Sequence, residues 1–435
     1  MIKNKLVLCV LLFTISSVGA IGQSYYLGSN NTNSPYTRYG YGELSNQGFG
    51  NSRAMGGVAY GLRSKYHINP VNPASYTAVD SLTFLFDAGI TLQNTNFDDG
   101  TYKLNAKNSS FDYVAMQFRL FKGMGMTIGL IPYSNVGYDI RNYNEDKENP
   151  EASNLERYQG DGGTRQAFLG LGYEVFKNFS VGANASFFWG DINRYRASVI
   201  AGAGAYSHMD ATYLSFKDIK LDFGAQYSRM IGKKKELTLG VTFTPGQKLH
   251  NDASIETKKT VGDPFQEGSS IIESYKRDTV STFEIPVGIG VGLAYVYDQR
   301  LTLALDYSLQ KWGSASFMNN KNAFDDRSKI SVGVEYLPSY TGRSYFSHIK
   351  YRFGAYYSEP YYRMQEENTS YRAAKEYGVS AGLCLPVPRS LSSVSLSAQY
   401  IRVDGQKNNM LNENYLRISI GVTFNERWFV KRKVR

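Results

Sequence analysis

From Leu82 to Phe424 the sequence alternates apolar residues with polar or small ones at a period of two. Near the C-terminus, for example, Leu416, Ile418 and Ile420 are separated by polar residues or glycine. Successive side chains of a β-strand point to opposite faces, so each such run predicts a strand with one apolar and one polar face. A chain built from these runs is predicted to be all-β.

Fourteen runs of this kind are present. They lie near 83–95, 110–121, 123–140, 164–176, 178–200, 208–231, 236–250, 280–297, 299–314, 327–338, 345–360, 373–385, 391–403 and 413–424. Many reach the roughly nine to eleven residues that cross a bilayer when a strand is tilted, and an even number suits a closed antiparallel barrel. The sequence therefore predicts a transmembrane antiparallel β-barrel of about 14 strands over residues 82–424.

The connections between the runs give a second test, because outer-membrane barrels have short periplasmic turns and longer outer loops. Short links such as 122–123 and 298–299 alternate with longer polar ones, notably 141–163 and 251–279. We therefore expect the two long segments to be outer loops and both ends of the barrel to be periplasmic. A soluble β-sandwich or propeller is the alternative, although its strands tend toward five or six residues.

The N-terminus has the order of a signal peptide. Basic residues precede an apolar stretch at 6–15, and small residues then lead to Gly22. Cleavage there would remove residues 1–22 and export the mature chain, which the barrel pattern assigns to the outer membrane. Cys384 would be the one cysteine left, so the fold has to be held without an internal disulfide.

Residues 23–81 do not alternate and are too many for a simple tail. They are rich in turn-forming residues, especially at 34–42, 54–61 and 68–75. Such a segment packs best where one backbone can approach another closely. We expect residues 23–81 to form a plug inside the barrel lumen, with a periplasmic gating arm as the alternative.

Two groups of motifs resemble the FadL/TodX family of outer-membrane transporters for long-chain fatty acids and hydrocarbons. The first is Ala-Met-Gly-Gly at 54–57 followed by Asn-Pro-Ala at 72–74, which is similar to elements of that family's hatch. The second is a late-barrel hairpin containing Pro286, Asp306 and Trp312. The resemblance implies a fourteen-stranded barrel with an N-terminal hatch and, by analogy, diffusive uptake of apolar molecules.

The candidate site residues come from the plug and from the polar face of the strands. The plug candidates are Gly56, Gly57, Asn69, Pro70, Asn72, Pro73 and Ala74. The lumen candidates are Arg119, Lys350, Arg352, Arg417 and Asp306, and Pro286 and Trp312 mark the barrel motif. The lumen charges are expected to pair with one another and with the plug, or to bind a ligand headgroup.

Residues 425–435 depart from the usual barrel pattern, since typical outer-membrane barrels end at the last aromatic residue. The segment is basic and is expected to be a periplasmic tail that contacts anionic lipid headgroups or a protein partner, or is simply solvated.

Catalysis and metal binding lack support in the sequence. The four histidines, His67, His208, His250 and His348, show no metal-ligand spacing, and Cys384 is interpreted as a small lumen filler. The net charge of +10 is dispersed along an exported chain, which argues against a nucleic-acid partner. We therefore expect no enzyme activity, no cofactor and no metal.

Two functions remain at this point. The first is a channel for passive uptake of hydrophobic or amphipathic, fatty-acid-like molecules, gated by the N-terminal plug. The second is a scaffold or accessory subunit of a secretion or envelope assembly complex, because fold alone does not decide function. The expected partners are outer-membrane lipid, a hydrophobic small-molecule ligand in the first case and envelope proteins in the second.

Overall fold

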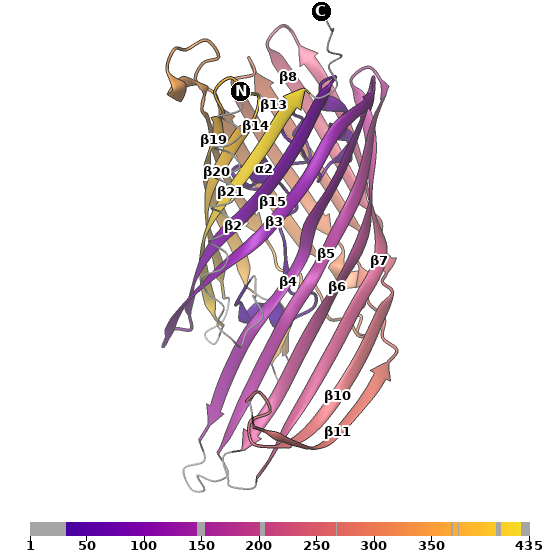
Figure 1. Ribbon diagram of the computed structural model, residues 1–435, viewed down its shortest axis with the longest axis vertical. Coiled ribbons are helices and arrows are strands. Elements are labelled where there is room, and N and C mark those ends of the chain that lie inside the picture. Colours follow the sequence, from indigo (N-terminus) through magenta and orange to yellow (C-terminus); the bar gives the residue numbers. More distant parts are fainter. Residues whose placement is uncertain are drawn as a thin grey trace, which may run out of the picture. The chain divides into compact units, whose positions relative to one another are not determined.

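The computed structural model describes residues 32–145, 153–200, 205–266, 268–366, 369–372, 374–405 and 410–427. Fourteen strands of this part form the barrel wall (Figure 1). They are β2 (Thr83–Asp98), β3 (Lys103–Phe121), β4 (Met124–Asn144), β5 (Asn154–Phe176), β6 (Phe179–Ile200), β7 (Tyr206–Ile231), β8 (Lys235–Thr244), β13 (Gly288–Tyr297), β14 (Leu301–Gln310), β15 (Arg327–Tyr336), β16 (Lys350–Ser358), β19 (Lys375–Pro386), β20 (Ser393–Asp404) and β21 (Asn412–Arg427).

The wall is a closed ring of antiparallel neighbours. Each barrel strand pairs with the next barrel strand along the chain, and β21 returns to pair with β2 from Asn412↔Asp98 to Arg427↔Thr83. The predicted fold class, an antiparallel barrel of fourteen strands, is confirmed. None of the helices among the described residues is long and apolar enough to cross a bilayer.

The two faces of the wall differ as the alternation predicts. Leu239 on β8 lies opposite Leu293 on β13, which lies opposite Leu305 on β14. These three side chains are 47%, 41% and 48% exposed, so they point away from the lumen and form part of an outward apolar band. Large apolar side chains tolerate such exposure when they contact hydrocarbon, as in a membrane-spanning barrel.

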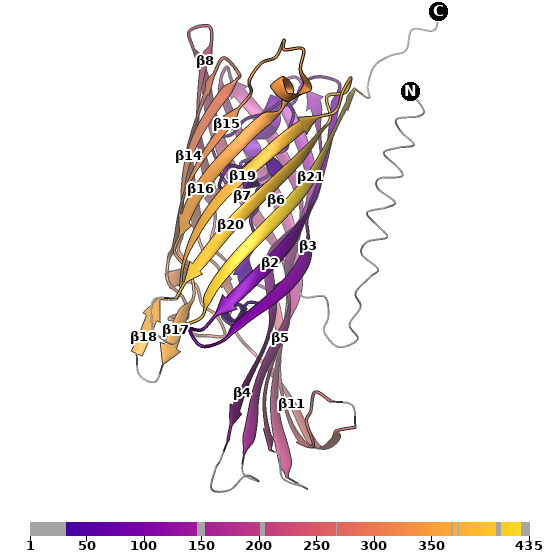
Figure 2. The same cartoon turned by 90° about the vertical axis from the view of Figure 1, so that its left-hand side faces the viewer.

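Four strands are about twice as long as β8 and the three barrel strands that follow it. β4 to β7 contain 21, 23, 22 and 26 residues, whereas β8, β13, β14 and β15 contain 10 each. Ten residues rise about 33 Å, which is enough to cross the hydrocarbon core at a tilt. The additional length of β4 to β7 therefore continues beyond the level at which the short strands end (Figure 2).

Two more strands widen this projecting part, so the expectation of outer loops at 141–163 and 251–279 is wrong. β10 (Asn251–Val261) pairs with the first half of β7, and β11 (Ser270–Thr279) pairs with β10. We call the projecting parts of β4 to β7 together with β10 and β11 the extension. The side chains of β11 are exposed along almost its whole length, so no buried apolar face marks β11 as a strand in the sequence.

An ion-pair cluster joins neighbouring strands of the extension. Asp139 on β4 accepts hydrogen bonds from Arg141 at 2.9 Å and from Arg157 on β5 at 3.0 Å. Burial alone would raise the pKa of the Asp139 carboxyl, but the two guanidinium groups outweigh it and hold the pKa below its usual value.

Short elements occupy the remaining described segments. They are η1 (Pro35–Arg38), β1 (Glu43–Leu44), α2 (Gly50–Arg53), η2 (Pro73–Ala78), β9 (Gln247–Lys248), β12 (Glu284–Ile285), η4 (Trp312–Ser314), η5 (Tyr345–His348), β17 (Arg363–Glu366) and β18 (Thr369–Arg372). The first four of these precede the barrel and hold the residues of the candidate site.

The predicted domain boundaries need one correction. β21 ends at Arg427 and not at Phe424, because its pairing with β2 continues for three more residues. The remainder of the predicted tail, 428–435, lies outside the described residues. The predicted signal peptide, 1–22, and the first part of the predicted plug, 23–31, also lie outside them.

The outward face of the barrel gives a direct test of membrane contact. Replacing Leu239 or Ile289 by arginine is expected to destabilise the inserted barrel by about 2–4 kcal/mol, because each side chain points to hydrocarbon. Heat-modifiable migration on gels and urea unfolding in lipid vesicles measure this loss. Ile271→Arg on β11, which lies in the extension, is the matched control and should leave assembly intact. Normal assembly of both barrel variants would contradict the membrane assignment.

Candidate functional site

The chain before the first barrel strand lies inside the ring of strands. Residues 32–81, which we call the inner segment, are drawn in indigo within the barrel in Figures 1 and 2. Tyr41, Val58, Ala74 and Tyr76 of this segment are fully buried. All seven plug candidates from the sequence belong to the inner segment.

The backbone of the inner segment rests directly on glycines of the wall. A Cβ atom added to Gly354 on β16 would lie 2.1 Å from the backbone nitrogen of Gly56, and one added to Gly240 on β8 would lie 1.8 Å from the backbone oxygen of Tyr60. Gly56 itself has φ of +69°, which non-glycine residues rarely adopt. Any larger residue on the wall at these points would push the segment away, so the contact is between backbone and backbone.

Asp306 on β14 fastens the middle of the inner segment. Its Oδ2 atom accepts hydrogen bonds from the backbone nitrogens of Ala59 at 2.5 Å and Tyr60 at 2.9 Å. The side chain is 4% exposed, and the structure therefore places this lumen candidate against the inner segment. A carboxylate that accepts backbone N–H groups is a strong, charge-assisted anchor.

The asparagines of the inner segment hold its own turns and the wall together. Asn72 Nδ2 donates to the backbone oxygens of Tyr60 at 2.8 Å and Ala225 on β7 at 3.3 Å, while its Oδ1 caps η2 by accepting from Ala74. Asn69 donates to the backbone oxygens of Ala59 at 2.7 Å and Leu62 at 3.0 Å.

Pro70, Pro73 and Gly57 complete the set of plug candidates. The backbone oxygen of Pro70 accepts from Asn184 on β6 at 2.9 Å, and Pro73 is at the start of η2. Gly57 donates its backbone N–H to Ser52 at 2.9 Å. The structure thus brings the seven plug candidates into one hydrogen-bonded segment, although they contact different strands.

The inner segment also completes the barrel wall where two strands separate. The pairing of β3 with β4 begins at the turn and ends at Val114↔Leu130, although β4 continues to Asn144. Beyond Leu130 along β4, β1 of the inner segment pairs with β4, with Leu44 opposite Ser134 and Glu43 opposite Asn135.

Side chains lengthen this contact along the edge of β4. Gln47 donates to the backbone oxygen of Pro132 at 3.0 Å, and Thr37 both accepts from and donates to the backbone of Gly137, at 3.1 and 3.2 Å. We call the stretch of β4 from 132 to 137 the seam. Within the described residues its free edge is covered by the inner segment and not by β3.

Two of the predicted lumen cations share one carboxylate at the end of the barrel with short turns. Glu335 on β15 accepts from Lys350 at 2.8 Å and from Arg352 at 2.7 Å, both on β16. Arg352 is fully buried and also donates to His67 of the inner segment at 3.3 Å. These charges pair with one another and with the inner segment, which is the first of the two roles expected for them.

The other two predicted cations behave differently. Arg417 on β21 donates to Gln93 on β2 at 2.6 Å and to Glu43 of β1, so it ties the inner segment to the strands that close the ring. Arg119 on β3 is half-buried and donates to the backbone oxygen of Phe121 at 3.1 Å. The structure does not bring Arg119 to the other candidates.

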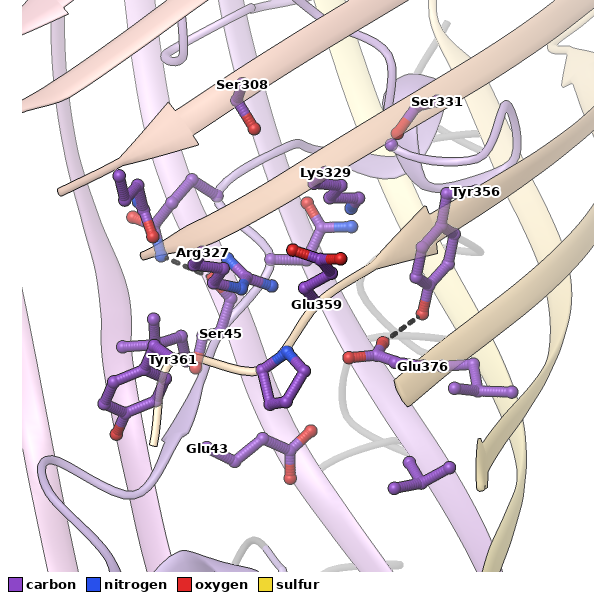
Figure 3. A pocket seen from close by; sticks show the side chains of 18 of the residues that line it. Glu43, Ser45, Ser308, Arg327, Lys329, Ser331, Tyr356, Glu359, Tyr361 and Glu376 are labelled. Atoms are coloured by element: carbon purple, nitrogen blue, oxygen red, sulfur yellow. Dashed lines mark hydrogen bonds between the residues drawn. The ribbon is translucent and has the colours of Figure 1, made fainter. Parts of the chain in front are cut away.

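A cavity of about 230 Å³ lies between the inner segment and the strands β14 to β21. We call it the chamber, and Figure 3 shows the side chains of Arg327, Lys329, Glu359 and Glu376 around it. Tyr356 donates to Glu376, and its ring lies 4.2 Å from Lys329 Nζ. Asp306 and Arg417 line the same cavity.

Aromatic side chains pack beside the chamber. Trp312 is fully buried, with its ring centre 4.6 Å from that of Tyr361 and 5.7 Å from that of Tyr41, and it donates to Gln310 at 3.0 Å. Pro286 lines a second cavity of about 130 Å³. The two residues of the predicted barrel motif therefore lie at the lumen, Trp312 as core and Pro286 as lining.

The sequence analysis missed Arg327, Lys329, Glu359 and Glu376 as chamber residues. The signal for the first two was present, because Arg327, Lys329 and Glu335 share the polar face of one alternating run. Glu359 lies just beyond β16 and Glu376 near the start of β19, where alternation alone does not place a side chain at a cavity.

A family model described as BamG matches residues 1–435, the full chain. The chain belongs to the BamG family. No curated protein matches the sequence of this BamG member.

Solved structures share the fold of this BamG member at low sequence identity. The Pseudomonas putida toluene transporter TodX is 15% identical, with 88% of this chain and 100% of that chain covered and a TM-score of 0.58. The CymD monoaromatic hydrocarbon channel is 14% identical, with 89% and 98% covered and a TM-score of 0.56.

A Pseudomonas aeruginosa FadL homologue is 12% identical, with 88% of this chain and 99% of that chain covered and a TM-score of 0.56. The resemblance to the FadL/TodX family is thus confirmed at the level of the fold, which is what identities in this range show.

The anchor at Asp306 gives a measurable effect on the inner segment. Asp306→Ala removes the acceptor of two buried N–H groups, so local opening at residues 59–61 should become easier by about 1–3 kcal/mol. Amide hydrogen exchange of these residues should accelerate about ten- to a hundredfold. Asp404→Ala removes an exposed ion pair and should leave their exchange unchanged. Equal exchange in both variants would show that Asp306 does not fasten the segment.

Proposed function

We propose that this chain is an outer-membrane channel for small amphipathic molecules and that its inner segment is the gate. The observation that carries the proposal is the seam. A wall formed partly by a separate segment can open there when that segment moves, without breaking the ring of barrel strands. The chamber lies directly behind this movable part of the wall.

The composition of the chamber supports an amphipathic ligand. Charged groups face it from β15 and β19, while Leu44, Val71, Ile401 and Val403 supply apolar lining. A molecule with a polar head and an apolar part satisfies both kinds of surface. The toluene and monoaromatic hydrocarbon channels that share the fold carry apolar molecules, and the ionised lining here favours a ligand with a polar group.

Stapling the seam tests the gate. Leu44 and Ser134 are directly opposite in an antiparallel pair, a spacing that a disulfide can bridge. In a Cys384→Ser background, Leu44→Cys with Ser134→Cys should abolish uptake of a fluorescent amphiphile under oxidising conditions, and a reductant should restore it. The single variant Leu44→Cys is the control and should transport normally. Full uptake by the oxidised, stapled barrel would contradict gating at the seam.

A second function, a scaffold in an envelope complex, is favoured by the extension. β11 pairs with β10 on one side, and in the described residues no strand pairs with its other edge. An unpaired strand edge beyond the membrane is a surface on which another polypeptide can add a strand.

Cross-linking separates this second function from the first. A photoreactive residue in place of Tyr275, which is 69% exposed on β11, should form an adduct with an envelope protein in whole cells. The same residue in place of Leu293 on the outward face of β13 should give no protein adduct. Absence of adducts from Tyr275, together with uptake by the purified barrel alone, would favour the channel.

A further inference from the structure

Two cations that line the chamber, Arg327 and Lys329, have no carboxylate partner among the described residues. Three other inward cations have carboxylate partners: Lys220 pairs with Asp222, Arg352 with Glu335 and Arg417 with Glu43. Among the described residues no ion pair joins Arg327 or Lys329 to a carboxylate, although both lie on the inward face of β15.

An unpaired charge in an enclosed space opposes folding, because the protein replaces part of its hydration without supplying a counter-charge. Arg327 and Lys329 are two residues apart on the same face of one strand, so their Cα atoms are about 7 Å apart. One anionic group can contact both. Ser308 and Ser331, which line the same cavity, add hydroxyl donors for that group.

Carboxylates face the same space from the next strands. Glu359 accepts from Ser328 at 3.1 Å, and Glu376 accepts from the hydroxyl of Tyr356. Figure 3 shows both acids among the side chains that surround the cavity, with Glu376 beside Tyr356. The chamber is thus lined by cations and by carboxylates, and the tyrosine rings that line it favour contact with an ammonium group.

The cavity of about 230 Å³ is large enough to hold a small polar headgroup.

We propose that the chamber is a binding site for a small zwitterionic group, with a phosphate, carboxylate or sulfonate at Arg327 and Lys329 and an ammonium group at Glu376. This inference deepens the proposed channel, because it names the polar part of the ligand on which that function rests. The zwitterion comes either as a free solute or as the headgroup of a lipid, and the chemistry of the site is the same for both.

Binding to the purified full-length barrel tests the site. In titration calorimetry, O-phosphoethanolamine should bind at least tenfold more tightly than inorganic phosphate or ethanolamine alone. Arg327→Gln with Lys329→Gln should weaken it at least tenfold, and Glu376→Gln should weaken it without affecting phosphate. Arg119→Gln is the matched control and should bind normally, since Arg119 lies away from the chamber. No binding, or binding unchanged by the double variant, would overturn the proposal.

A thermal measurement checks the same site without any ligand. Because Arg327 and Lys329 are unpaired, their double replacement by glutamine should raise the Tm of the empty barrel, whereas Lys220→Gln, which breaks an ion pair, should lower it. A lower Tm for the double variant would show that the fold pairs these cations after all.

Two further experiments are needed. Competition with lipid vesicles identifies the source of the zwitterion, and a comparison of binding with uptake distinguishes failure of the binding site from failure of the channel. Competition by phosphatidylethanolamine vesicles, but not by phosphatidylglycerol vesicles, would assign the site to a lipid headgroup, and absence of competition would assign it to a free solute. Binding that depends on Arg327 and Lys329 without uptake would overturn the channel and leave the site. Uptake by a double variant that no longer binds would overturn the inference that transported molecules bind at this site, and leave the channel.

Discussion

The structure depends on direct contact between the backbone of the inner segment and the glycine-rich inner face of the wall. A fourteen-stranded ring encloses more space than its own inward side chains fill, and here the inward positions at Gly240 and Gly354 carry no side chain at all. The inner segment occupies that space and exchanges hydrogen bonds with strands on many sides of the barrel. Side chains at this contact bind buried backbone groups: Asp306 Oδ2 accepts from Ala59, and Asn72 donates to Ala225.

Electrostatics divides the lumen into two regions. At the end with short turns, Glu335 binds both Lys350 and Arg352, so charges there serve to hold the inner segment in place. On the other side of that segment Arg417 and Glu43 also pair, whereas among the described residues no ion pair joins Arg327 or Lys329 to a carboxylate. The first region is a permanent part of the fold, and the second is suited to an exchangeable partner.

The sequence predicted the barrel more completely than the lumen. Strand alternation is a local property, since each side chain reports its own face, and it placed all fourteen barrel strands. The strands β10 and β11 were taken for a loop because β11 is exposed along almost its whole length and runs such as Lys258-Lys259-Thr260 on β10 carry no apolar period. What identifies them as strands is pairing with β7, a contact that the local sequence does not contain.

The same distinction explains the outcome for the site. Motifs located the plug candidates because glycine, proline and asparagine have backbone preferences that are visible residue by residue. Side-chain partners such as His67 and Arg352 are separated by hundreds of residues, and alternation says that a charge points inward but not what it will meet. The separation of β3 from β4 at the seam depends on the course of both strands in space, and no short sequence motif predicts it.

The pairing of the first and last barrel strands has a consequence for how the barrel closes. Because β21 bonds to β2 and its Arg417 reaches Glu43, the ring is completed by the end of the polypeptide around contents that come from its beginning. The strands that close the ring therefore contact the inner segment directly, so the packing of the N-terminal residues and the closure of the barrel are coupled through Arg417 and Glu43.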